Sequence, residues 1–273
     1  MDTGNNSTTS QSASPKPKRR WYQYSLRTLL IFVTLFAVAC SWLAVKMQQA
    51  KRQRKAVDAI RKHSGEIFYD NDKYDNYGRF YPQAISHSGL YKILGNDFFA
   101  NVYLVKIRDY PKADLKSIAE FSHLKMLWIE GSRINDDGLE DLRFFTQLKS
   151  LCLADAEISS SGLKHLKELP QLEELYLQNN AITDDGLKYL QDLSQLQLLR
   201  LDKTAITDNG LKTLKKISHL QTLFLNGTKI TDAGLENLKD FGQLTTLGIR
   251  QTIITYAAIR DLQKALPNLK IER

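Results

Sequence analysis

The chain has 273 residues, of which 42% are apolar, 25% charged and 10% aromatic. This composition excludes a wholly disordered chain, and the two Cys exclude a scaffold held together by disulfides. The net charge of +8 comes from residues 1–62, which hold 12 Lys or Arg against 2 Asp or Glu, whereas residues 63–273 hold 26 against 28. A nucleic-acid reader should carry a basic face on its folded part, so we expect no nucleic-acid partner.

The first 46 residues predict a tail followed by a membrane span. Residues 1–25 start with a polar, low-complexity segment and predict a disordered basic tail. Residues 26–46 predict a transmembrane helix, because the 18 residues from Thr28 to Val45 carry no charge. They would extend over about 27 Å as a helix, close to the thickness of a hydrocarbon core. Trp21 and Trp42 flank the apolar run, as interfacial aromatic residues do.

Three fates of this segment remain open. Ala37-Val38-Ala39 is similar to a signal peptidase site, and with Cys40 it loosely resembles a lipobox. The apolar run continues past Cys40, which favours an uncleaved single-pass anchor. Five basic residues lie on each side of the run, so the positive-inside rule does not choose an orientation. The short N-terminal segment favours a repeat domain on the extracytoplasmic side.

Residues 47–101 predict a juxtamembrane helix and a small α+β N-terminal cap. The basic helix should run from Lys46 to Lys62 and end before Gly65. Residues Glu66–Tyr69 predict a strand, and Ser88–Phe99 predict an amphipathic helix with Leu90, Ile93, Leu94 and Phe98 on one face.

An internal repeat occupies the rest of the chain, and we place its domain at residues 102–273. Six copies of LxxLxLxxTxITDxGLxxLxxLxx begin at intervals of 24 residues, at Leu124, Leu148, Leu172, Leu196, Leu220 and Leu244. The unit resembles the leucine-rich repeat of the ITDxGL type, and the whole chain is similar to bacterial leucine-rich-repeat proteins with an N-terminal membrane anchor. The resemblance implies an α/β solenoid, with a parallel β-sheet on the concave face and helices on the convex face.

The unit itself predicts the same architecture. LxxLxL alternates as a short strand does, and the two Leu of GLxxL share one helical face. Thr-Asp before that face predicts an N-cap, and the recurring Gly predicts close packing or a turn. The family pattern places Asn at the ninth position, where Asn180 can satisfy backbone groups, Thr204 can do so more weakly and Ala156 cannot.

The two ends of the array depart from the consensus. Val102, Val105 and Ile107, followed by Leu115 and Ile118, predict a seventh, imperfect copy. In the last copy Tyr256 and Ala258 replace the usual Asp and Gly. Leu269-Lys270-Ile271 then predicts a closing strand.

The candidate site is a set of outward-facing strand positions on the concave face. The central positions include Trp128, Tyr176, Arg200 and Phe224, which we expect to anchor a protein ligand. The next positions include Glu130, Gln178, Asp202 and Arg250, which we expect to tune polarity. Cys152 lies among them and is expected to fill space rather than react. Adjacent parallel strands are about 4.8 Å apart, so these residues should form continuous rows.

No enzymatic, metal or cofactor site is expected. None of the five His residues has a Cys or carboxylate at metal-binding spacing, and no phosphate-binding loop or nucleophile motif is present. The favoured interpretation is a membrane-anchored, non-catalytic protein that presents the concave surface to an unknown protein ligand. The alternatives are an envelope-organising protein that self-associates, and an enzyme with a site formed by Asp70, Asp72, Asp75 and His87 of the cap.

Overall fold

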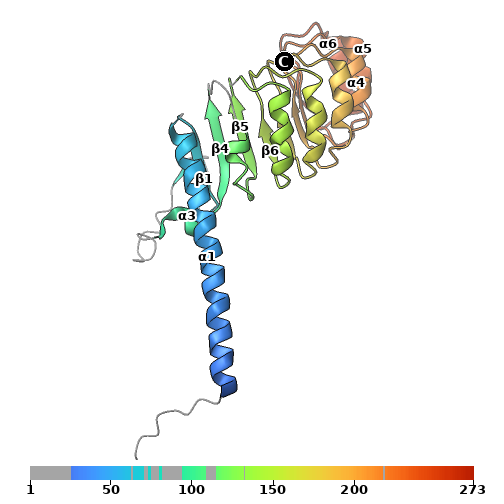
Figure 1. The fold of residues 1–273 in the computed structure, drawn as a ribbon. Coiled ribbons are helices and arrows are strands. Elements are labelled where there is room, and N and C mark those ends of the chain that lie inside the picture. Colours follow the sequence, from blue (N-terminus) through green and yellow to red (C-terminus); the bar gives the residue numbers. More distant parts are fainter. Residues whose placement is uncertain are drawn as a thin grey trace, which may run out of the picture. The chain divides into compact units, whose positions relative to one another are not determined.

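The computed structural model describes residues 26–62, 64–70, 73–74, 80–81, 94–108, 115–131, 133–217 and 219–273. The predicted tail over residues 1–25 lies outside them. The chain forms two compact units, Met1–Val45 and Lys46–Arg273. Helix α1, Leu26–Lys62, begins in the first unit and ends in the second (Figure 1).

The first part of α1 is apolar and uncovered. No residue from 26 to 45 is buried, and large side chains such as Leu26 and Phe36 are 74% and 71% exposed. An 18-residue window of this helix has a mean hydropathy of 2.4. By length and composition the helix can cross a membrane.

The second part of α1 packs on the cap. Ala56, Val57 and Ile60 are buried in the same core as the first strands. Buried Gln53 donates a hydrogen bond from Nε2 to the Ala100 carbonyl at 3.0 Å. The helix ends at Lys62, and the Gly65 amide then donates to the Ile60 carbonyl at 3.0 Å. The predicted end of this helix before Gly65 is therefore confirmed.

The cap combines strands with a short helix. Strand β1, Glu66–Tyr69, confirms the predicted strand and pairs antiparallel with β4. Strands β2, Lys73–Tyr74, and β3, Phe80–Tyr81, form a separate antiparallel pair. Helix α3 covers only Asn96–Phe99. The single helix predicted over Ser88–Phe99 is wrong at Gly95, whose left-handed φ of 78° interrupts it, and residues 88–93 lie outside the described residues.

A nine-stranded sheet joins the cap to the repeats, in the order β1-β4-β5-β6-β7-β8-β9-β10-β11. All its strand pairs are parallel except β1 with β4. The bounds are β4 Val102–Arg108, β5 Met126–Glu130, β6 Ser150–Cys152, β7 Glu174–Tyr176, β8 Leu198–Arg200, β9 Thr222–Phe224, β10 Thr246–Gly248 and β11 Lys270–Glu272. Strands β4 and β11 confirm the imperfect first copy and the closing strand.

Helical turns follow the strands and lie on the other side of the leucine core (Figure 1). The first four are 3-10 helices: η1 Leu115–Ile118, η2 Asp137–Phe144, η3 Gly162–Glu168 and η4 Asp184–Leu190. The last three are α-helices: α4 Asp208–Leu214, α5 Asp232–Glu236 and α6 Tyr256–Ala265. Both Leu187 and Leu190 of one GLxxL are fully buried, so the predicted shared face is confirmed. The solenoid predicted from the repeat is the observed fold.

Consecutive repeats are joined by a carboxylate ladder. Asp208 Oδ1 accepts from the Thr231 amide at 2.8 Å, and its Oδ2 accepts from the Thr231 hydroxyl at 2.7 Å. Asp184 bonds Thr207 in the same way. Both Thr hydroxyls also cap their own helices, as predicted. A Cβ on Gly234 would overlap the Asp208 carboxylate, so this recurring Gly serves close packing.

Candidate functional site

One row of side chains crosses the face of the sheet that the helices leave open. Strand register aligns Lys106, Trp128, Cys152, Tyr176, Arg200, Phe224 and Gly248 in this central row. The alignment arises because each repeat contributes the same strand position. The structure therefore brings together the four predicted anchors Trp128, Tyr176, Arg200 and Phe224.

In the first half of the central row, aromatic rings meet over a small residue. The centroids of the Trp128 and Tyr176 rings are 6.1 Å apart, with Cys152 on the strand between them. The Lys106 Nζ lies 5.4 Å from the Trp128 centroid. Such ring and cation contacts hold the side chains in place before any ligand arrives.

In the second half, Arg200 connects an aromatic ring to a carboxylate. Its Cζ lies 4.7 Å from the Phe224 centroid, and its Nε donates to Asp202 Oδ2 at 2.9 Å. Gly248 makes room for the Phe224 ring, because a Cβ there would overlap that ring. Phe224 and Arg200 are both only partly exposed. The guanidinium is therefore held in one orientation.

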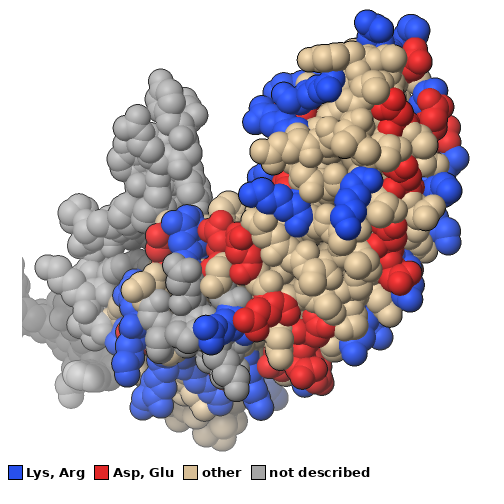
Figure 2. Space-filling view, turned by 90° about the horizontal axis from the view of Figure 1, so that it is seen from above, with Lys and Arg blue, Asp and Glu red and all other residues tan. Residues whose placement is uncertain are grey.

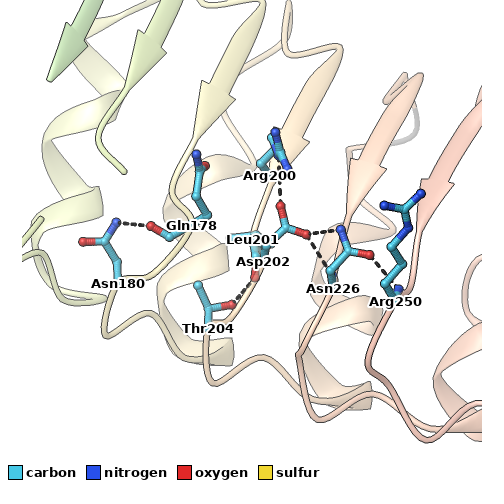
Figure 3. Close-up of polar contacts among 8 residues, drawn as sticks. All are labelled: Gln178, Asn180, Arg200, Leu201, Asp202, Thr204, Asn226 and Arg250. Carbon is cyan, nitrogen blue, oxygen red and sulfur yellow. Dashed lines mark hydrogen bonds and ion pairs between the residues drawn. The ribbon is translucent and has the colours of Figure 1, made fainter. Parts of the chain in front are cut away.

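The outer row, which includes Glu130, Gln178, Asp202 and Arg250, contains a chain of hydrogen bonds along the strand ends (Figure 3). Asp202 Oδ1 accepts from the Asn226 backbone N–H at 2.8 Å and from the Asn226 side-chain Nδ2 at 2.6 Å. Asn226 Oδ1 in turn accepts from the Arg250 amide at 2.6 Å. Asp202 is 6% exposed. Its carboxylate therefore positions Arg200 and the next two strands rather than facing solvent.

The ninth repeat position holds the turn after a strand where that residue is Asn or Thr, whereas Ala156 has no polar side chain to do so. Asn180 Nδ2 donates to the carbonyls of Leu153, Leu177 and Gln178 at 2.7, 3.0 and 3.2 Å. Thr204 Oγ1 donates to one carbonyl, that of Leu201, at 2.6 Å. The predicted stronger role of Asn and weaker role of Thr are confirmed by these bonds, of which Figure 3 draws one for each side chain, Asn180 to Gln178 and Thr204 to Leu201.

The residue before the ninth position is left-handed in six consecutive repeats. These residues are Gly131, Asp155, Asn179, Lys203, Gly227 and Gln251, with φ between 53° and 66°. Sequence reasoning missed this turn, because only two of the six are Gly. The Gly at 131 and 227 and the Asn at 179 were the available signal.

Two ionisable groups in the central row stay neutral. Desolvation and the neighbouring Glu174 carboxylate raise the pKa of Tyr176 to about 12. Its hydroxyl donates to Glu174 Oε2 at 3.3 Å. Burial also raises the pKa of the Cys152 thiol, and Cys152 is 6% exposed. Cys152 therefore occupies space in the row and is not a thiolate nucleophile.

The remaining predicted side chains border the row. Glu130 and Gln178 are partly exposed and Arg250 is exposed. Glu130 pairs with Arg108 at 3.3 Å and lines a hollow of about 430 Å³ together with Gly131 and Asp155. Of the four residues expected to tune polarity, Glu130, Gln178 and Arg250 reach the surface, whereas Asp202 is buried. Sequence reasoning missed Lys106, whose strand position was marked by buried Val105 and Ile107 on either side.

The site offers contacts rather than ligands for a metal. Within the described ranges, no group of three or more His, Cys, Asp or Glu residues is placed to hold a metal ion. Among the same residues, Trp128 Nε1 and Gln178 Oε1 are buried without a hydrogen-bond partner. The cap residues Asp72, Asp75 and His87 lie outside the described residues.

Comparisons with known proteins agree with the repeat. A family described as "Leucine Rich repeat" matches residues 168–190 and 216–239. No curated protein sequence matches the chain. An internalin structure from Listeria monocytogenes is 25% identical, with a TM-score of 0.39, over 60% of this chain and 58% of its own.

Two further solved structures are similar. An internalin C2 from Listeria monocytogenes is 21% identical, with a TM-score of 0.46, over 62% of this chain and 80% of its own. A leucine-rich-repeat protein of Leptospira interrogans is 22% identical, with a TM-score of 0.45, over 58% and 45%. The matched repeats, the parallel sheet and its helices make this chain a leucine-rich-repeat solenoid.

Proposed function

We propose that this chain is a membrane-anchored, non-catalytic protein whose sheet face binds a protein ligand. Leucine-rich-repeat domains typically bind proteins, and their stacked strands give an extended binding surface. The observation that carries the proposal is the central row itself. Three large aromatic residues and an Arg, with Cys152 among them, share one row on the sheet face that the described helices leave uncovered.

The chemistry of the central row suits a protein interface. Trp, Tyr and Arg are the side chains most enriched among interface residues that dominate binding energy. Contacts with Lys106, Asp202 and Glu174 already restrict Trp128, Arg200 and Tyr176, and Arg200 lies over the ring of Phe224. Because fewer rotamers are lost when a ligand docks, the ordering penalty of association is smaller. Trp128, Tyr176 and Phe224 would supply apolar contact, and Arg200 would supply a directed cation.

The charge of the repeats supports a protein ligand over a nucleic acid. Lys and Arg alternate with Asp and Glu over the repeats on the face seen in Figure 2. Residues 63–273 are close to neutral, with 26 basic and 28 acidic residues. A surface with mixed charges gives register and specificity to a protein complex but little attraction for a phosphate backbone.

The proposed anchor is the apolar part of α1, Thr28 to Val45. No described residue covers its large apolar side chains, and a hydrocarbon core would remove them from water. Basic residues flank it on both sides, with Arg27 before and Lys46 after. We propose that the repeat domain lies on the extracytoplasmic side. Cleavage after Ala39 and lipidation at Cys40 are the competing fates, and intact-mass measurement of the membrane-extracted protein distinguishes all three.

The binding surface is tested by truncating one tyrosine at a time. Tyr176 lies on the sheet face and Tyr189 on the helical side of the same repeat, and both are partly buried beside a cation. Full-length chain is used to capture partners from the source membranes. We expect Tyr176→Ala to weaken capture by about 30-fold, as truncation of a dominant contact does, and Tyr189→Ala to leave it unchanged. Equal loss with both variants, or with neither, would reject the central row as the binding site.

A further inference from the structure

We propose that the exposed face of α1 just beyond the apolar segment binds the headgroups of anionic phospholipids through Lys51, Arg52 and Lys55. This inference rests on the proposed anchor, because the bilayer must begin near Val45. It adds a second contact with the membrane and names the lipid class that makes it.

The charge of this part of α1 is strongly one-sided. Residues 46–62 contain seven Lys or Arg and one acidic residue, Asp58. The cap packs against one side of the helix, where Ala50, Gln53 and Val57 are buried. The basic residues therefore fall on the sides that the cap leaves free.

One of the cations is already used by the protein. Arg54 Nε lies 3.3 Å from Asp97 Oδ2, and its Nη2 donates to the Leu94 carbonyl at 3.0 Å. Asp97 also accepts from the Tyr69 hydroxyl at 2.8 Å, so it is a fixed acceptor within the cap. Arg54 therefore joins α1 to the cap and does not belong to the lipid-binding face.

Lys51, Arg52 and Lys55 have no such role. All three are exposed, and none makes an ion pair or side-chain hydrogen bond with another described residue. Lys51 and Lys55 are four residues apart and share one face, roughly opposite the buried side of the helix. Like charges at this spacing repel each other. Asp58 lies on the same side of the helix but forms no ion pair with either lysine, so this side keeps a net positive charge.

The position of these residues along the helix commits the surface to a bilayer. With a rise of about 1.5 Å per residue, Lys51 lies about 9 Å and Lys55 about 15 Å beyond Val45. The headgroup layer is about 5–8 Å thick on each side, and charges act over a Debye length of about 8–10 Å in physiological salt. Arg61 and Lys62 lie about 24–26 Å beyond Val45, outside this range. Anionic phospholipid headgroups are the charge-complementary ligand at that depth.

The test reports which lipid lies beside this face. The native tryptophans are removed by Trp21→Phe, Trp42→Phe and Trp128→Phe, and Ala44→Trp introduces a reporter two turns before Lys51 on the same face. The full-length chain is reconstituted in phosphatidylcholine vesicles. Quenching by brominated phosphatidylglycerol is then compared with quenching by brominated phosphatidylcholine.

We expect a preference for phosphatidylglycerol that disappears in 1 M NaCl, where the Debye length is about 3 Å. Lys51→Gln/Lys55→Gln should reduce the preference by about fivefold or more, since each cation near a surface contributes about that factor. The matched variant Arg61→Gln/Lys62→Gln removes the same charge and should retain the preference.

Three results would overturn the inference. Equal quenching by both brominated lipids in the reporter chain with its lysines unchanged would show that Lys51 and Lys55 do not select the lipid. An equal loss of the phosphatidylglycerol preference in the two double variants would show the same. Neither result would contradict the proposed anchor. Absence of quenching by either brominated lipid would show instead that α1 does not enter the bilayer, and both proposals would fail.

Discussion

Asn180 provides the sharpest test of how the repeats hold together. Its side chain is 7% exposed and donates to three backbone carbonyls, including that of Leu153 in the preceding repeat. Its Oδ1 also accepts from the Ile158 amide at 3.4 Å. Asn180→Ala removes all four contacts and takes the side-chain donor away from the Leu153 and Leu177 carbonyls, while the Gln178 carbonyl keeps its bond from the Asp155 backbone amide.

The magnitude follows from the number of bonds lost. A buried hydrogen bond contributes about 1 kcal/mol net, and the Asn180 side chain has two N–H donors and one accepting oxygen, so the loss of three bonds makes Asn180→Ala cost about 3 kcal/mol. Thr204→Ala removes a single bond to the Leu201 carbonyl and should cost about 1 kcal/mol. Asn180→Thr keeps one bond of the Thr204 kind and should fall between the two. One kcal/mol corresponds to about 2–4 °C in Tm for a unit of this size, so Asn180→Ala should lower Tm by about 6–12 °C.

The assay is thermal unfolding of the full-length chain in detergent, followed by circular dichroism. The three variants should rank Asn180→Ala, Asn180→Thr, Thr204→Ala in order of decreasing loss. If Asn180→Ala lost no more than Thr204→Ala, the three carbonyl bonds would not stabilise the turn, and the argument would be wrong.

Three further perturbations test other parts of the structure. In the same unfolding assay, Lys203→Gly should stabilise the protein by about 0.5–1 kcal/mol and Gly227→Ala should destabilise it by about 1 kcal/mol. Both positions have a left-handed backbone, which only Gly adopts without strain. A change of the same sign in both variants would contradict this. Burial raises the pKa of Asp136, but hydrogen bonds from Ser159 and Ser161 outweigh burial and leave that pKa lowered. The contribution of the Asp136 carboxylate to folding stability is therefore present above about pH 4 and is lost as pH falls through the folded-state pKa. Asp136→Asn should therefore destabilise the protein at pH 7 and have less effect at pH 3. An equal effect at both pH values would show that the ionised form of the Asp136 carboxylate does not stabilise the fold. The Cys152 thiol should react with iodoacetamide at pH 8 at least tenfold more slowly in the folded chain than in urea, because burial keeps it protonated; comparable rates would show that it is accessible.

The repeat fixed much of the fold in advance, because its period alone determines which side chains are buried. The two Leu of GLxxL, such as Leu187 and Leu190, are spaced so that both lie on one helical face, and the strand leucines keep the same register in every copy. The central row follows from the same register, so the residues that form it could be named without coordinates. The distinction between 3-10 and α-helical turns could not, since both bury Leu at this spacing.

Long-range pairing accounts for what the sequence did not predict. Asp208 is an acidic residue at a helix start by sequence, yet its carboxylate bonds Thr231 in the next repeat. Asp202 occupies an outward strand position, yet Asn226 and Arg200 enclose its carboxylate. Thr231 and Asn226 lie about one repeat away in sequence and become partners only when the strands are stacked, whereas Arg200 is two residues from Asp202. A pattern of residue types indicates which side chains face outward, but not which are already bonded to a neighbour.

The central claim is that the open face of the sheet binds a protein. A photo-crosslinking residue placed at Tyr176 or at Tyr189 in the full-length chain reports contacts on the two sides of one repeat in the source membranes. We predict a discrete crosslinked partner from position 176 and none from position 189, with the adduct lost in a Trp128→Ala/Phe224→Ala background. The same adduct from both positions, or adducts only with a second copy of this chain, would contradict the claim, the latter favouring self-association.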